Sequence, residues 1–529
     1  MQVQTVIRNA RIIDGAGTPW FRGDVAVDQG KIAAMGVLQG LEAKETLDAG
    51  DKYLMPGFID AHTHSDFVLL KNPSALFKLR QGVTTQLIGE CGYSAAPVTD
   101  ESVVPYSQYI GFLRAGVEPQ WTWRSFKEWL DHLASLPLGT NVRSYVGHAT
   151  VWMSTLGFTY RTPTPEEMQK MIALVERCMD EGACGMTSGL IYSPGMYCPH
   201  EEMKEIMRGL VPKRGVYESH MRNESSSMLD CVKETIDVGE ANGIPVQIAH
   251  HKACGVKNWG ALEKSLKLID EARARGVDVT FNQYPYDAAS TTLRAILPGW
   301  VQQGGVDALC ERLQSKEVRE RLTEEVLQRD CTWDNFYENS NGAEGIILLC
   351  FPKNPEIEGK TLAEAAEFYK KSPVETAFDL IAANNGEDTT AYKMMSESDV
   401  LLGLAHPAGM VASDTIPAPE KAKSHPRGFG TFPHLLDYYV KQTGALRLEE
   451  AVRRISSAPA RRMGIMDRGL IAPGLAADLV LVDMDALKDN ATYESPQSPP
   501  DGIKMVMVNG QIALENGQEK QLGFGTVLR

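Results

Sequence analysis

The middle of this chain alternates short apolar runs with stretches of helical periodicity, and this alternation constrains the fold more than any other feature. Strands that alternate with helices are typical of βαβ units, which build parallel sheets. Such runs occur at residues 57–64, 83–91, 142–148, 185–192, 215–220, 245–250, 277–284 and 410–414. Eight strands with helical crossovers predict an α/β fold of the (β/α)8, TIM-like barrel type. An open doubly wound sheet fits less well, because no Gly-x-Gly-x-x-Gly motif opens a helix.

The segments between these runs carry local helix signals. Residues 164–167, Thr-Pro-Glu-Glu, match a capping box with proline at the first helical position. Apolar residues then recur at helical spacing, at Met168, Met171, Ile172, Val175 and Met179. Leu262, Leu266 and Ile269 form a second such face before Gly276. Helices are therefore expected in both segments.

The two ends of the chain share a different pattern. Residues 6–13 and 24–27 are short and β-branched, and residues 477–482 and 503–508 resume that pattern before an Asn-Gly hairpin signal. Neither end has enough strands to cover a core alone. We therefore predict one small β-sandwich domain built from residues 1–56 and 468–529, with the barrel domain over residues 57–467.

A long stretch separates the seventh predicted strand from the eighth, at residues 297–405. It carries helical patterns of its own, for example over residues 306–328 and 362–371. Loops of this length without secondary structure are uncommon in compact domains. We expect this stretch to be a lid that is inserted within the barrel domain, on the face where the strands end.

Composition excludes several kinds of partner. The chain has 53 Lys and Arg against 68 Asp and Glu, a net charge of −15, whereas nucleic-acid binders depend on clustered positive charge. No apolar run reaches the about eighteen residues of a membrane span, and the first residues lack a secretory pattern. The nine cysteines have no framework spacing, as in reduced cytoplasmic enzymes. We expect a cytoplasmic protein without nucleic-acid or membrane partners.

Residues able to bind a metal stand at the ends of five predicted strands. His62 and His64 end the first strand, and alternate residues of a strand share one face, so both imidazoles can point at one ion. Taken alone, such a pair can equally be satisfied by the backbone. The other four strand-end residues are Cys91, His220, His250 and Asp414. The carboxyl ends of barrel strands build the active site, so the set of six favours a metal centre.

This set of donors suits zinc better than magnesium or calcium, which prefer oxygen ligands. Zinc held by three protein ligands keeps a position for water and lowers the pKa of that water to about 7. Such an ion supplies hydroxide and polarises a carbonyl group. Asp414 can act as general base and then pass the proton to the leaving nitrogen. The predicted reaction is metal-assisted hydrolysis of an amide-like bond.

Residues 56–64, Pro-Gly-Phe-Ile-Asp-Ala-His-Thr-His, resemble the opening signature of the amidohydrolase superfamily. Later motifs are similar to those of the N-acyl-D-amino-acid deacylase (D-aminoacylase) family, and the match runs along nearly the whole chain. These motifs are Gly89-Glu90-Cys91-Gly92-Tyr93-Ser94, Ser219-His220-Met221-Arg222, His250-His251-Lys252, Tyr284-Pro285-Tyr286, Ser413-Asp414 and His425-Pro426-Arg427. That family has a cysteine where many relatives have a carboxylated lysine.

The resemblance implies hydrolysis of the amide bond of N-acyl-D-amino acids or related compounds. It implies one tight zinc at Cys91, His220 and His250. A second, weaker metal position would be offered by His62, His64 and the catalytic Asp414.

The resemblance also implies a small-molecule substrate with a carboxylate. Positions that grip this carboxylate in the family are matched by Lys252, Tyr284, Ser290 and Arg427. An arginine fork and a lysine suit such an anchor, which would also select the enantiomer. The other interpretations are a surface salt bridge for Arg427 and a packed strand aromatic for Tyr284.

Other histidines have less defined roles. His148 closes the third predicted strand, where it can contact the substrate or pack in the core. His251 faces away from His250 and is expected to pack between barrel and helices. No motif surrounds the remaining histidines, which are His132, His200, His406 and His434.

Three features depart from the family pattern. Glu90 stands where relatives usually carry asparagine and would add negative charge near the zinc. Thr415 stands where glycine is common, and the segment from Ser290 to Asp414 is longer. These changes leave the acyl group and the side-chain preference open.

Two other functions remain as alternatives. The first is a cyclic amide or ureide hydrolase of hydantoinase or dihydroorotase type, which usually relies on a bridging lysine where this chain has Cys91. The second is a barrel that has lost catalysis and serves as a binding protein, although such relatives typically lose metal ligands. The sequence leaves the oligomeric state and the number of bound metals open.

Overall fold

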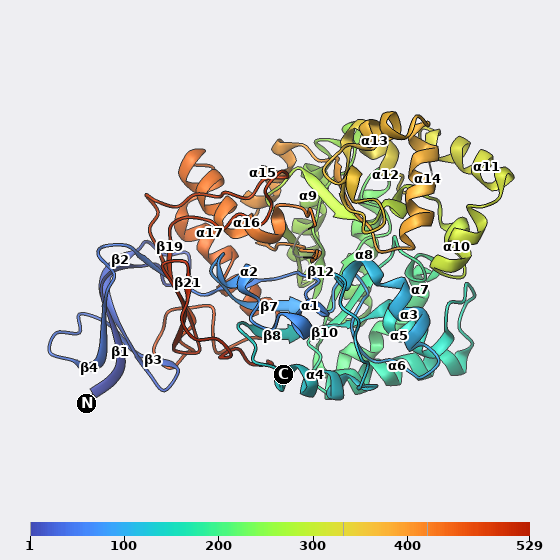
Figure 1. Ribbon diagram of the computed structural model, residues 1–529. Helices are drawn as coiled ribbons and strands as arrows, with labels where there is room; N and C mark the ends of the chain where they lie inside the picture. The colour runs from blue at the N-terminus through green and yellow to red at the C-terminus, as the bar shows by residue number, and fades with distance from the viewer. Residues whose placement is uncertain (1, 332, 420–421) are drawn as a thin grey trace.

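The computed structural model describes residues 2–331, 333–419 and 422–529 (Figure 1). Each of the eight apolar runs in the middle of the chain contains a strand, and the third run is interrupted at Tyr145. The strands are β6 (Phe58–Asp60), β7 (Val83–Ile88), β8 (Asn141–Ser144), β9 (Val146–Gly147), β10 (Gly185–Gly189), β11 (Val216–His220), β12 (Val246–Ile248), β13 (Val279–Gln283) and β17 (Gly409–Val411).

These strands pair in parallel and largely in chain order. One sheet of six strands has the order β17-β13-β12-β11-β10-β9, and one of three has the order β6-β7-β8. The backbone after β17 also joins the backbone after β6, because Asp414 N donates to His62 O at 2.8 Å and His64 N donates to Thr415 O at 2.9 Å. The protein is thus a mixed α/β fold, in which distant segments meet where the strands end.

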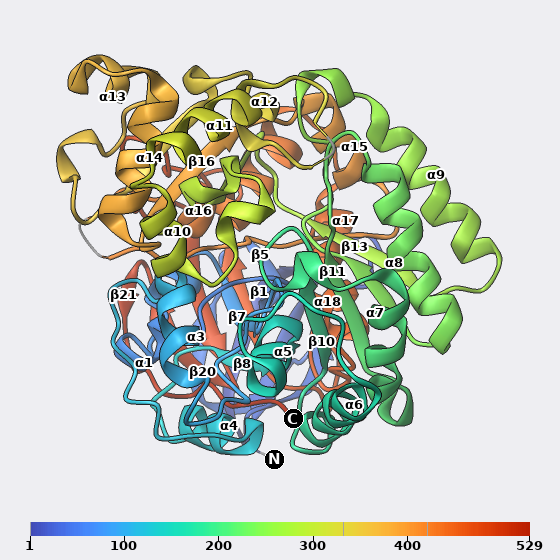
Figure 2. The same cartoon turned by 90° about the vertical axis from the view of Figure 1, so that its right-hand side faces the viewer.

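Helices cover the outside of the parallel strands (Figure 2). Their bounds are α5 (His148–Leu156), α6 (Pro165–Asp180), α7 (His200–Ile206), α8 (Met228–Asn242), α9 (Ala261–Ala274) and α15 (Glu397–Ala405). The predicted capping box at α6 is confirmed, since Thr164 Oγ1 accepts a hydrogen bond from Glu167 N. The apolar faces predicted for α6 and α9 are buried. Among helices of the described residues, none combines the length and apolarity that crossing a bilayer requires.

Shorter helices precede and follow this region. Before β10 lie α1 (Val68–Lys71), α2 (Leu76–Leu79), α3 (Val103–Tyr109) and α4 (Phe126–Ala134). After β17 lie α16 (Arg427–His434), a π-helical segment (Leu435–Gln442), α17 (Leu448–Arg454) and α18 (Ser457–Arg462).

The stretch between β13 and β17 has its own helices, as expected. The helix predicted over residues 306–328 is divided into α10 (Val306–Arg312) and α11 (Lys316–Leu327), because the Ser315 hydroxyl caps α11 by accepting from Val318 N. The other helices are α12 (Phe336–Asn339), α13 (Leu362–Tyr369) and α14 (Pro373–Asn384). The sequence did not predict the antiparallel sheet of this region, which is formed by β14 (Ala288–Thr291), β15 (Ile346–Cys350) and β16 (Thr389–Lys393).

Strands from both ends of the chain share one sheet, at the left of Figure 1. They are β1 (Gln2–Ile12), β2 (Phe21–Asp28), β3 (Lys31–Gly36), β4 (Glu42–Asp48), β5 (Tyr53–Pro56), β18 (Leu479–Val482), β19 (Ile503–Val508), β20 (Gln511–Glu515) and β21 (Gln518–Glu519). The link is β5, which pairs with β1 on one side and with β18 on the other. Hydrogen bonds join these nine strands into one sheet, and the face-to-face packing of a sandwich stays a prediction.

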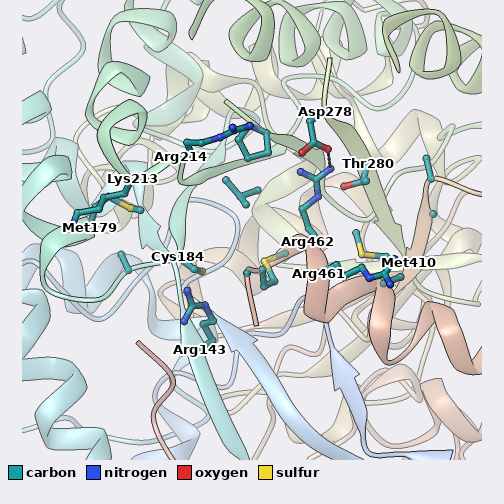
Figure 3. Close-up of a pocket in the computed structure, with 18 of the residues that line it drawn as sticks. Arg143, Met179, Cys184, Lys213, Arg214, Asp278, Thr280, Met410, Arg461 and Arg462 are labelled. Atoms are coloured by element: carbon teal, nitrogen blue, oxygen red, sulfur yellow. Dashed lines mark hydrogen bonds and ion pairs between the residues drawn. The ribbon is translucent and has the colours of Figure 1, made fainter. Parts of the chain in front are cut away.

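Two cavities lie at opposite ends of the parallel strands. One is lined by Val216 and Gly409, the first residues of β11 and β17 (Figure 3). The other is lined by His220, the last residue of β11, and by Asp414, which follows β17. The predicted metal ligands therefore gather at the carboxyl ends of the strands.

Candidate metal centre

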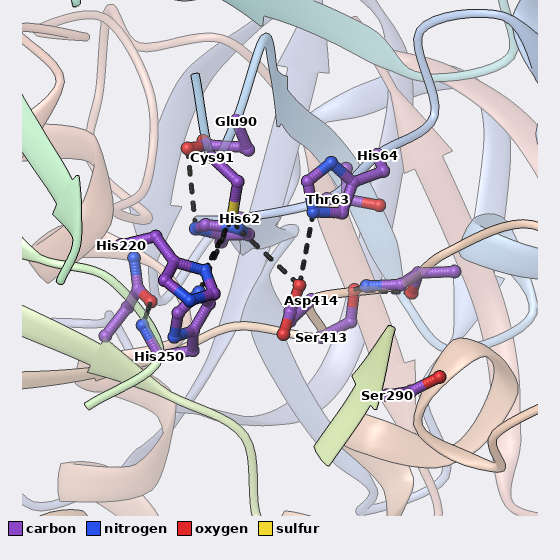
Figure 4. Close-up of polar contacts among 12 residues, drawn as sticks. His62, Thr63, His64, Glu90, Cys91, His220, His250, Ser290, Ser413 and Asp414 are labelled. Atoms are coloured by element: carbon purple, nitrogen blue, oxygen red, sulfur yellow. Dashed lines mark hydrogen bonds and ion pairs between the residues drawn. The ribbon is translucent and has the colours of Figure 1, made fainter. Parts of the chain in front are cut away.

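The six predicted ligands form one buried cluster (Figure 4). Its centre is the thiol of Cys91, whose Sγ lies 3.4 Å from Nε2 of His62, 3.5 Å from Nδ1 of His220 and 3.5 Å from Nε2 of His250. The ligand atoms of Cys91, His220 and His250 all lie within 4.8 Å of one another, and so do those of His62, His64 and Cys91. Cys91 is thus within reach of two adjacent metal positions.

Backbone conformation helps to aim three of these side chains. Cys91, His250 and Asp414 have φ values of 51°, 31° and 47°. Residues other than glycine rarely adopt such left-handed conformations, which cost free energy and cluster at functional sites. Each of the three lies within a few residues after its strand, so the chain turns sharply there and directs the side chain toward the cluster.

The donor set fits zinc. Two ligands of a tetrahedral zinc, one sulfur at about 2.3 Å and one nitrogen at about 2.05 Å, lie about 3.5 Å apart. This separation matches the distances from Cys91 Sγ to the three imidazoles. Burial lowers the pKa of His220 and His250 well below the usual value, so both rings are neutral and able to coordinate. Burial also raises the pKa of the Cys91 thiol, which a bound cation would reverse.

Asp414 lies between the histidines and a buried arginine. Its Oδ1 is 3.3 Å from His64 Nε2 and 3.6 Å from His62 Nε2, and its Oδ2 is 3.0 Å from Arg427 Nη1. Burial alone would raise the pKa of Asp414, but Arg427 and the imidazoles outweigh burial and hold that pKa well below the usual value. The carboxylate is therefore ionised and can accept a proton or bind a cation.

Glu218 fixes the orientation of the His62 ring, and sequence reasoning missed it. Its Oε1 lies 2.7 Å from His62 Nδ1 and also accepts a hydrogen bond from Asn282, while Oε2 accepts one from Gln247. A carboxylate at Nδ1 leaves Nε2 free to coordinate, as is common for metal-binding histidines. A signal was present, because Glu218 shares one face of β11 with His220.

Glu224 is a second carboxylate that the sequence did not reveal. Both of its oxygens accept hydrogen bonds from Lys252 Nζ at 2.7 Å, and Oε1 lies 3.1 Å from His250 Nδ1. Lys252, predicted to grip the substrate, is thus paired within the protein. The three side chains are buried together, so Glu224 links the lysine to a metal ligand.

Thr415, which follows Asp414, takes part in a buried network beneath the site. Lys78 Nζ donates to Thr415 Oγ1 and Ser413 Oγ, each at 2.9 Å, and pairs with Asp60 at 2.6 Å. The side chain of Lys78 is fully buried. A buried ammonium requires such partners, so the threonine hydroxyl supports the segment that carries Asp414.

The charge of the Glu90 carboxyl depends on its pKa, and we expected this side chain to add negative charge near the zinc. Burial, and then the neighbouring Glu218, raise the pKa of Glu90 well above the usual value, which favours the neutral form of this carboxyl over the charged form that we expected. Its Oε2 lies 3.4 Å from His62 Nδ1. Neither carboxyl oxygen of Glu90 has a hydrogen-bond partner among the residues that the structure describes.

Aromatic and polar side chains line the cavity beside the ligands. Arg427, at the start of α16, is fully buried, so the alternative of a surface salt bridge is wrong. Its guanidinium lies 4.6 Å from the centre of the Tyr284 ring and donates to Ser290 O at 3.2 Å. Arg427 therefore contacts residues that line the cavity, and the lining itself includes Tyr93, Phe112, Tyr192, Thr291, Phe336 and Ile416. Tyr284, Ser290 and Lys252 thus surround the same space as the ligands.

His148 is placed elsewhere. It begins α5, its ring lies 5.7 Å from that of Trp152, and it is not among the residues that line this cavity. Burial, and then Arg222, lower the pKa of His148 to about 3. His251 packs as expected between strand and helix, with Nε2 2.6 Å from Ser265 Oγ of α9.

Comparison with known sequences decides the family. A model of the Amidohydrolase family matches residues 45–514. The chain belongs to this family. It is 34% identical to D-aminoacylase of Alcaligenes xylosoxydans xylosoxydans over 96% of this chain and 93% of that protein. It is 31% identical to N-acyl-D-glutamate deacylase of the same organism, with the same coverage. The D-aminoacylase resemblance that the motifs indicated is thereby confirmed.

Solved structures show the same relationship. A crystal structure of D-aminoacylase superimposes with a TM-score of 0.83, at 31% identity and 99% coverage of both chains. The N-acyl-D-glutamate deacylase from Bordetella bronchiseptica, complexed with zinc and a phosphonate inhibitor, also gives 0.83, at 30% identity and 100% coverage of both. L-Hydantoinase from Arthrobacter aurescens gives 0.58 at 16% identity, which shows a shared fold alone. The family member described here is a metal-dependent hydrolase of carbon–nitrogen bonds.

Proposed function

We propose that this enzyme hydrolyses the amide bond of N-acyl-D-amino acids, with zinc as its metal. The observation that carries the proposal is the approach of three imidazole nitrogens to within 3.5 Å of Cys91 Sγ. Relatives that match nearly the whole chain support the substrate class, since they are named D-aminoacylase, N-acyl-D-glutamate deacylase and N-acyl-D-aspartate deacylase. A cytoplasmic location remains a proposal that rests on the scattered cysteines.

For the fold, we propose three features beyond the sheets described above: a closed barrel, a separate β domain and a lid. We propose that the two parallel sheets act as one closed barrel of eight strands. Residues 1–56 and 468–529 would form the separate β domain, and residues 297–405 would form the lid. Support comes from backbone hydrogen bonds on both sides of the gap between the sheets. Cys184 N, just before β10, donates to Ser144 O of β8 at 3.0 Å, and Asp414 N, after β17, donates to His62 O, after β6, at 2.8 Å.

Two metal positions follow from the donor set. Cys91, His220 and His250 would hold the tighter ion, and His62, His64 and Asp414 would offer a second, weaker position. Zinc in such a site supplies an ionised water near neutral pH and polarises a carbonyl group.

The side chains around the metal positions perform the remaining steps. Asp414, kept ionised by Arg427, would accept a proton at its carboxylate and release it to the nitrogen of the departing amine. The aromatic walls of the cavity, such as Tyr93 and Phe112, would exclude bulk water. This exclusion strengthens each electrostatic contact inside the cavity.

The substrate carboxylate would be bound by groups that line this cavity or contact its lining. Tyr284 and Ser290 offer hydroxyls, and the Lys252 ammonium lies 5.7 Å from the centre of the Tyr284 ring. Arg427 contacts two lining residues, with its guanidinium 4.6 Å from the centre of the Tyr284 ring and Nη1 3.0 Å from Asp414 Oδ2. Holding that carboxylate at one side of the metal centre would allow only one enantiomer to present its acyl carbonyl. His148 is left out of this group, because it does not line the cavity and, unlike Arg427, its ring nitrogens have no hydrogen-bond partner among the described residues.

The test is amine release from paired N-acetyl-D- and N-acetyl-L-amino acids, with bound zinc counted in the same sample. Turnover of the D-substrates alone is expected. Equal turnover of both enantiomers, or no turnover by a fully zinc-loaded enzyme, would contradict the proposal. The second result would favour a cyclic amide as the substrate. Cys91→Ser should lose zinc and activity, while Cys178→Ser, which alters a buried cysteine of α6, should retain both.

A further inference from the structure

A second cavity, of about 710 Å³, opens at the amino-terminal ends of the parallel strands (Figure 3). Val216 lines this cavity and begins β11, whereas His220 ends the same strand in the metal centre. Four steps along a strand span about 13 Å, so the body of the strands separates the two cavities. The proposed hydrolysis leaves this second cavity without a role.

The lining of this cavity is strongly basic, in a chain whose net charge is −15. Asp278 is the one carboxylate among the lining residues. Eight basic side chains line the same space, namely Arg143, Lys213, Arg214, Arg273, Arg453, Arg461, Arg462 and Arg529. A recess lined by one sign of charge focuses the electric field and concentrates ions of the opposite sign.

Half of these basic groups have a carboxylate partner. The pairs are Lys213 with Asp180 at 3.0 Å, Arg453 with Glu450 at 2.7 Å, Arg462 with Asp278 at 2.7 Å, and Arg529 with Asp131. Their positive charge is therefore balanced within the protein. Arg462 is the most enclosed of the four, with a side chain only 4% exposed.

The other four have no carboxylate oxygen within 4.0 Å among residues 2–331, 333–419 and 422–529. They are Arg143, Arg214, Arg273 and Arg461. Arg143 Nε is buried and has no hydrogen-bond partner in the described part of the chain. Four uncompensated guanidinium groups in one recess repel each other, so an anion bound between them would be favoured.

Apolar side chains share the lining with these arginines. Met179, Met410 and Met463 stand among them, and Figure 3 shows Met179 and Met410 beside the same space as Arg214 and Arg461. Methionine side chains adapt to ligands of varied shape. The recess therefore offers charge together with an apolar surface, which suits a small organic anion.

We propose that this cavity binds a small molecule carrying phosphate groups, at a site separate from the metal centre. Arginine forks match phosphate oxygens in geometry and donate two parallel hydrogen bonds to them. The arginines enter from several elements: Arg143 lies in β8, Arg214 follows a 3-10 helix before β11, and Arg461 lies in α18. A single bound anion would thus connect segments that are far apart in the sequence.

The test is calorimetric titration of the zinc-loaded enzyme with a hexose 1,6-bisphosphate, and separately with inorganic phosphate. Saturable binding of one molecule per chain is expected. The double variant Arg214→Gln with Arg461→Gln should weaken binding at least about tenfold. Both residues are exposed, and neither has a carboxylate oxygen within 4.0 Å in the described part of the chain, so their loss should leave the fold intact. The control Arg208→Gln alters an exposed arginine outside the cavity and should bind as tightly as the wild type.

Each outcome decides the question. Tighter binding of the bisphosphate than of inorganic phosphate would support an organic phosphate ester that also contacts the methionines, and equal binding would support the free anion. No saturation by either probe, or equal weakening in the double variant and the Arg208→Gln control, would overturn the proposal. Activity of the double variant toward N-acetyl-D-amino acids is measured in parallel, so that failure of the hydrolase proposal and failure of this site are told apart.

Discussion

Arg427 Nη1 lies 3.0 Å from Oδ2 of Asp414, and both side chains are buried in the wall of the metal centre. Because α16 carries the arginine and the segment after β17 carries the aspartate, the pair joins two elements. The remaining oxygen of Asp414 is left facing the histidines, with Oδ1 3.3 Å from His64 Nε2. The guanidinium thus orients the carboxylate and keeps it ionised at the same time.

We expect Arg427→Gln to reduce kcat/KM for an N-acetyl-D-amino acid by about 100-fold, because Asp414 loses the group that orients it and keeps it ionised, and a 100-fold loss corresponds to about 3 kcal/mol of activation free energy. Arg427→Lys should fall between this variant and the wild type, since it keeps the charge but not the fork. Steady-state kinetics with zinc-loaded protein measure the effect. Arg454→Gln, at a buried arginine paired with Glu450, should change stability but not kcat/KM. Wild-type kinetics in Arg427→Gln would refute the role.

The contact between Glu218 and His62 should control metal affinity. Glu218→Gln keeps the shape of the side chain but removes the charge opposite His62 Nδ1. Loss of such a partner lowers metal affinity by about 10- to 100-fold. Competition with a chelator measures it, and the second, weaker metal should be released first. Asp388→Asn, at a fully buried carboxylate outside the metal centre, serves as the control. Equal zinc retention in both variants would show that Glu218 does not act on the metal.

Much of the fold could be predicted from the sequence, because parallel strands are buried on both faces and form continuous apolar runs. The sheet of β14, β15 and β16 could not. Residues that pair across this sheet, such as Ser290 and Ala391, are far apart in the chain. In addition, β14 is the short segment Ala-Ala-Ser-Thr, which has no alternation of apolar and polar residues. Pairing of that kind is set by tertiary contacts, not by local pattern.

The candidate site also contains residues that the sequence predicted and residues that it did not. The six predicted metal ligands could be identified because residues of ligand type end five of the eight predicted strands. Glu218 and Glu224 were missed, because their partners His62 and Lys252 come from other strand ends and a carboxylate in a sequence does not show which residue it pairs with. For Glu218 the only signal was its place two residues before His220, on the same face of β11. Lys252 shows the consequence: its place in the motif suggested a substrate anchor, and the sequence did not reveal that it also pairs with Glu224 at 2.7 Å.

Removal of metal should lower the thermal midpoint of the wild-type protein by several degrees. The reason is linkage: an ion present at about 1,000 times its dissociation constant stabilises the fold by about 4 kcal/mol. Thermal unfolding with and without a chelator measures the shift. Cys91→Ser should show almost no shift, and Cys178→Ser should behave as the wild type. A chelator-induced shift in Cys91→Ser as large as that of the wild type would exclude Cys91 as a ligand of the tight site.

The pH dependence of stability should include a contribution from Asp334, which lies in the segment between β13 and β17. Burial raises the pKa of this carboxyl from 3.8 to about 6, despite donated hydrogen bonds from Glu224 N, Ser225 Oγ and Asn339 Nδ2. Between these two values the unfolded chain releases the proton while the folded chain retains it. The free energy of unfolding therefore falls by up to about 3 kcal/mol as the pH rises from 4 to above 6.

Asp334→Asn cannot titrate, so the thermal midpoint of the variant relative to that of the wild type should rise between pH 4 and pH 7. Contributions from the metal ligands are shared by both proteins and cancel in this difference. The matched control is Asp330→Asn, at an exposed carboxylate four residues earlier that pairs with Lys257 at 2.8 Å. The control should show no such rise, because hydrogen bonding to Lys257 lowers the pKa of Asp330. A difference between Asp334→Asn and the wild type that stays constant over this range would mean that Asp334 is ionised in the folded protein.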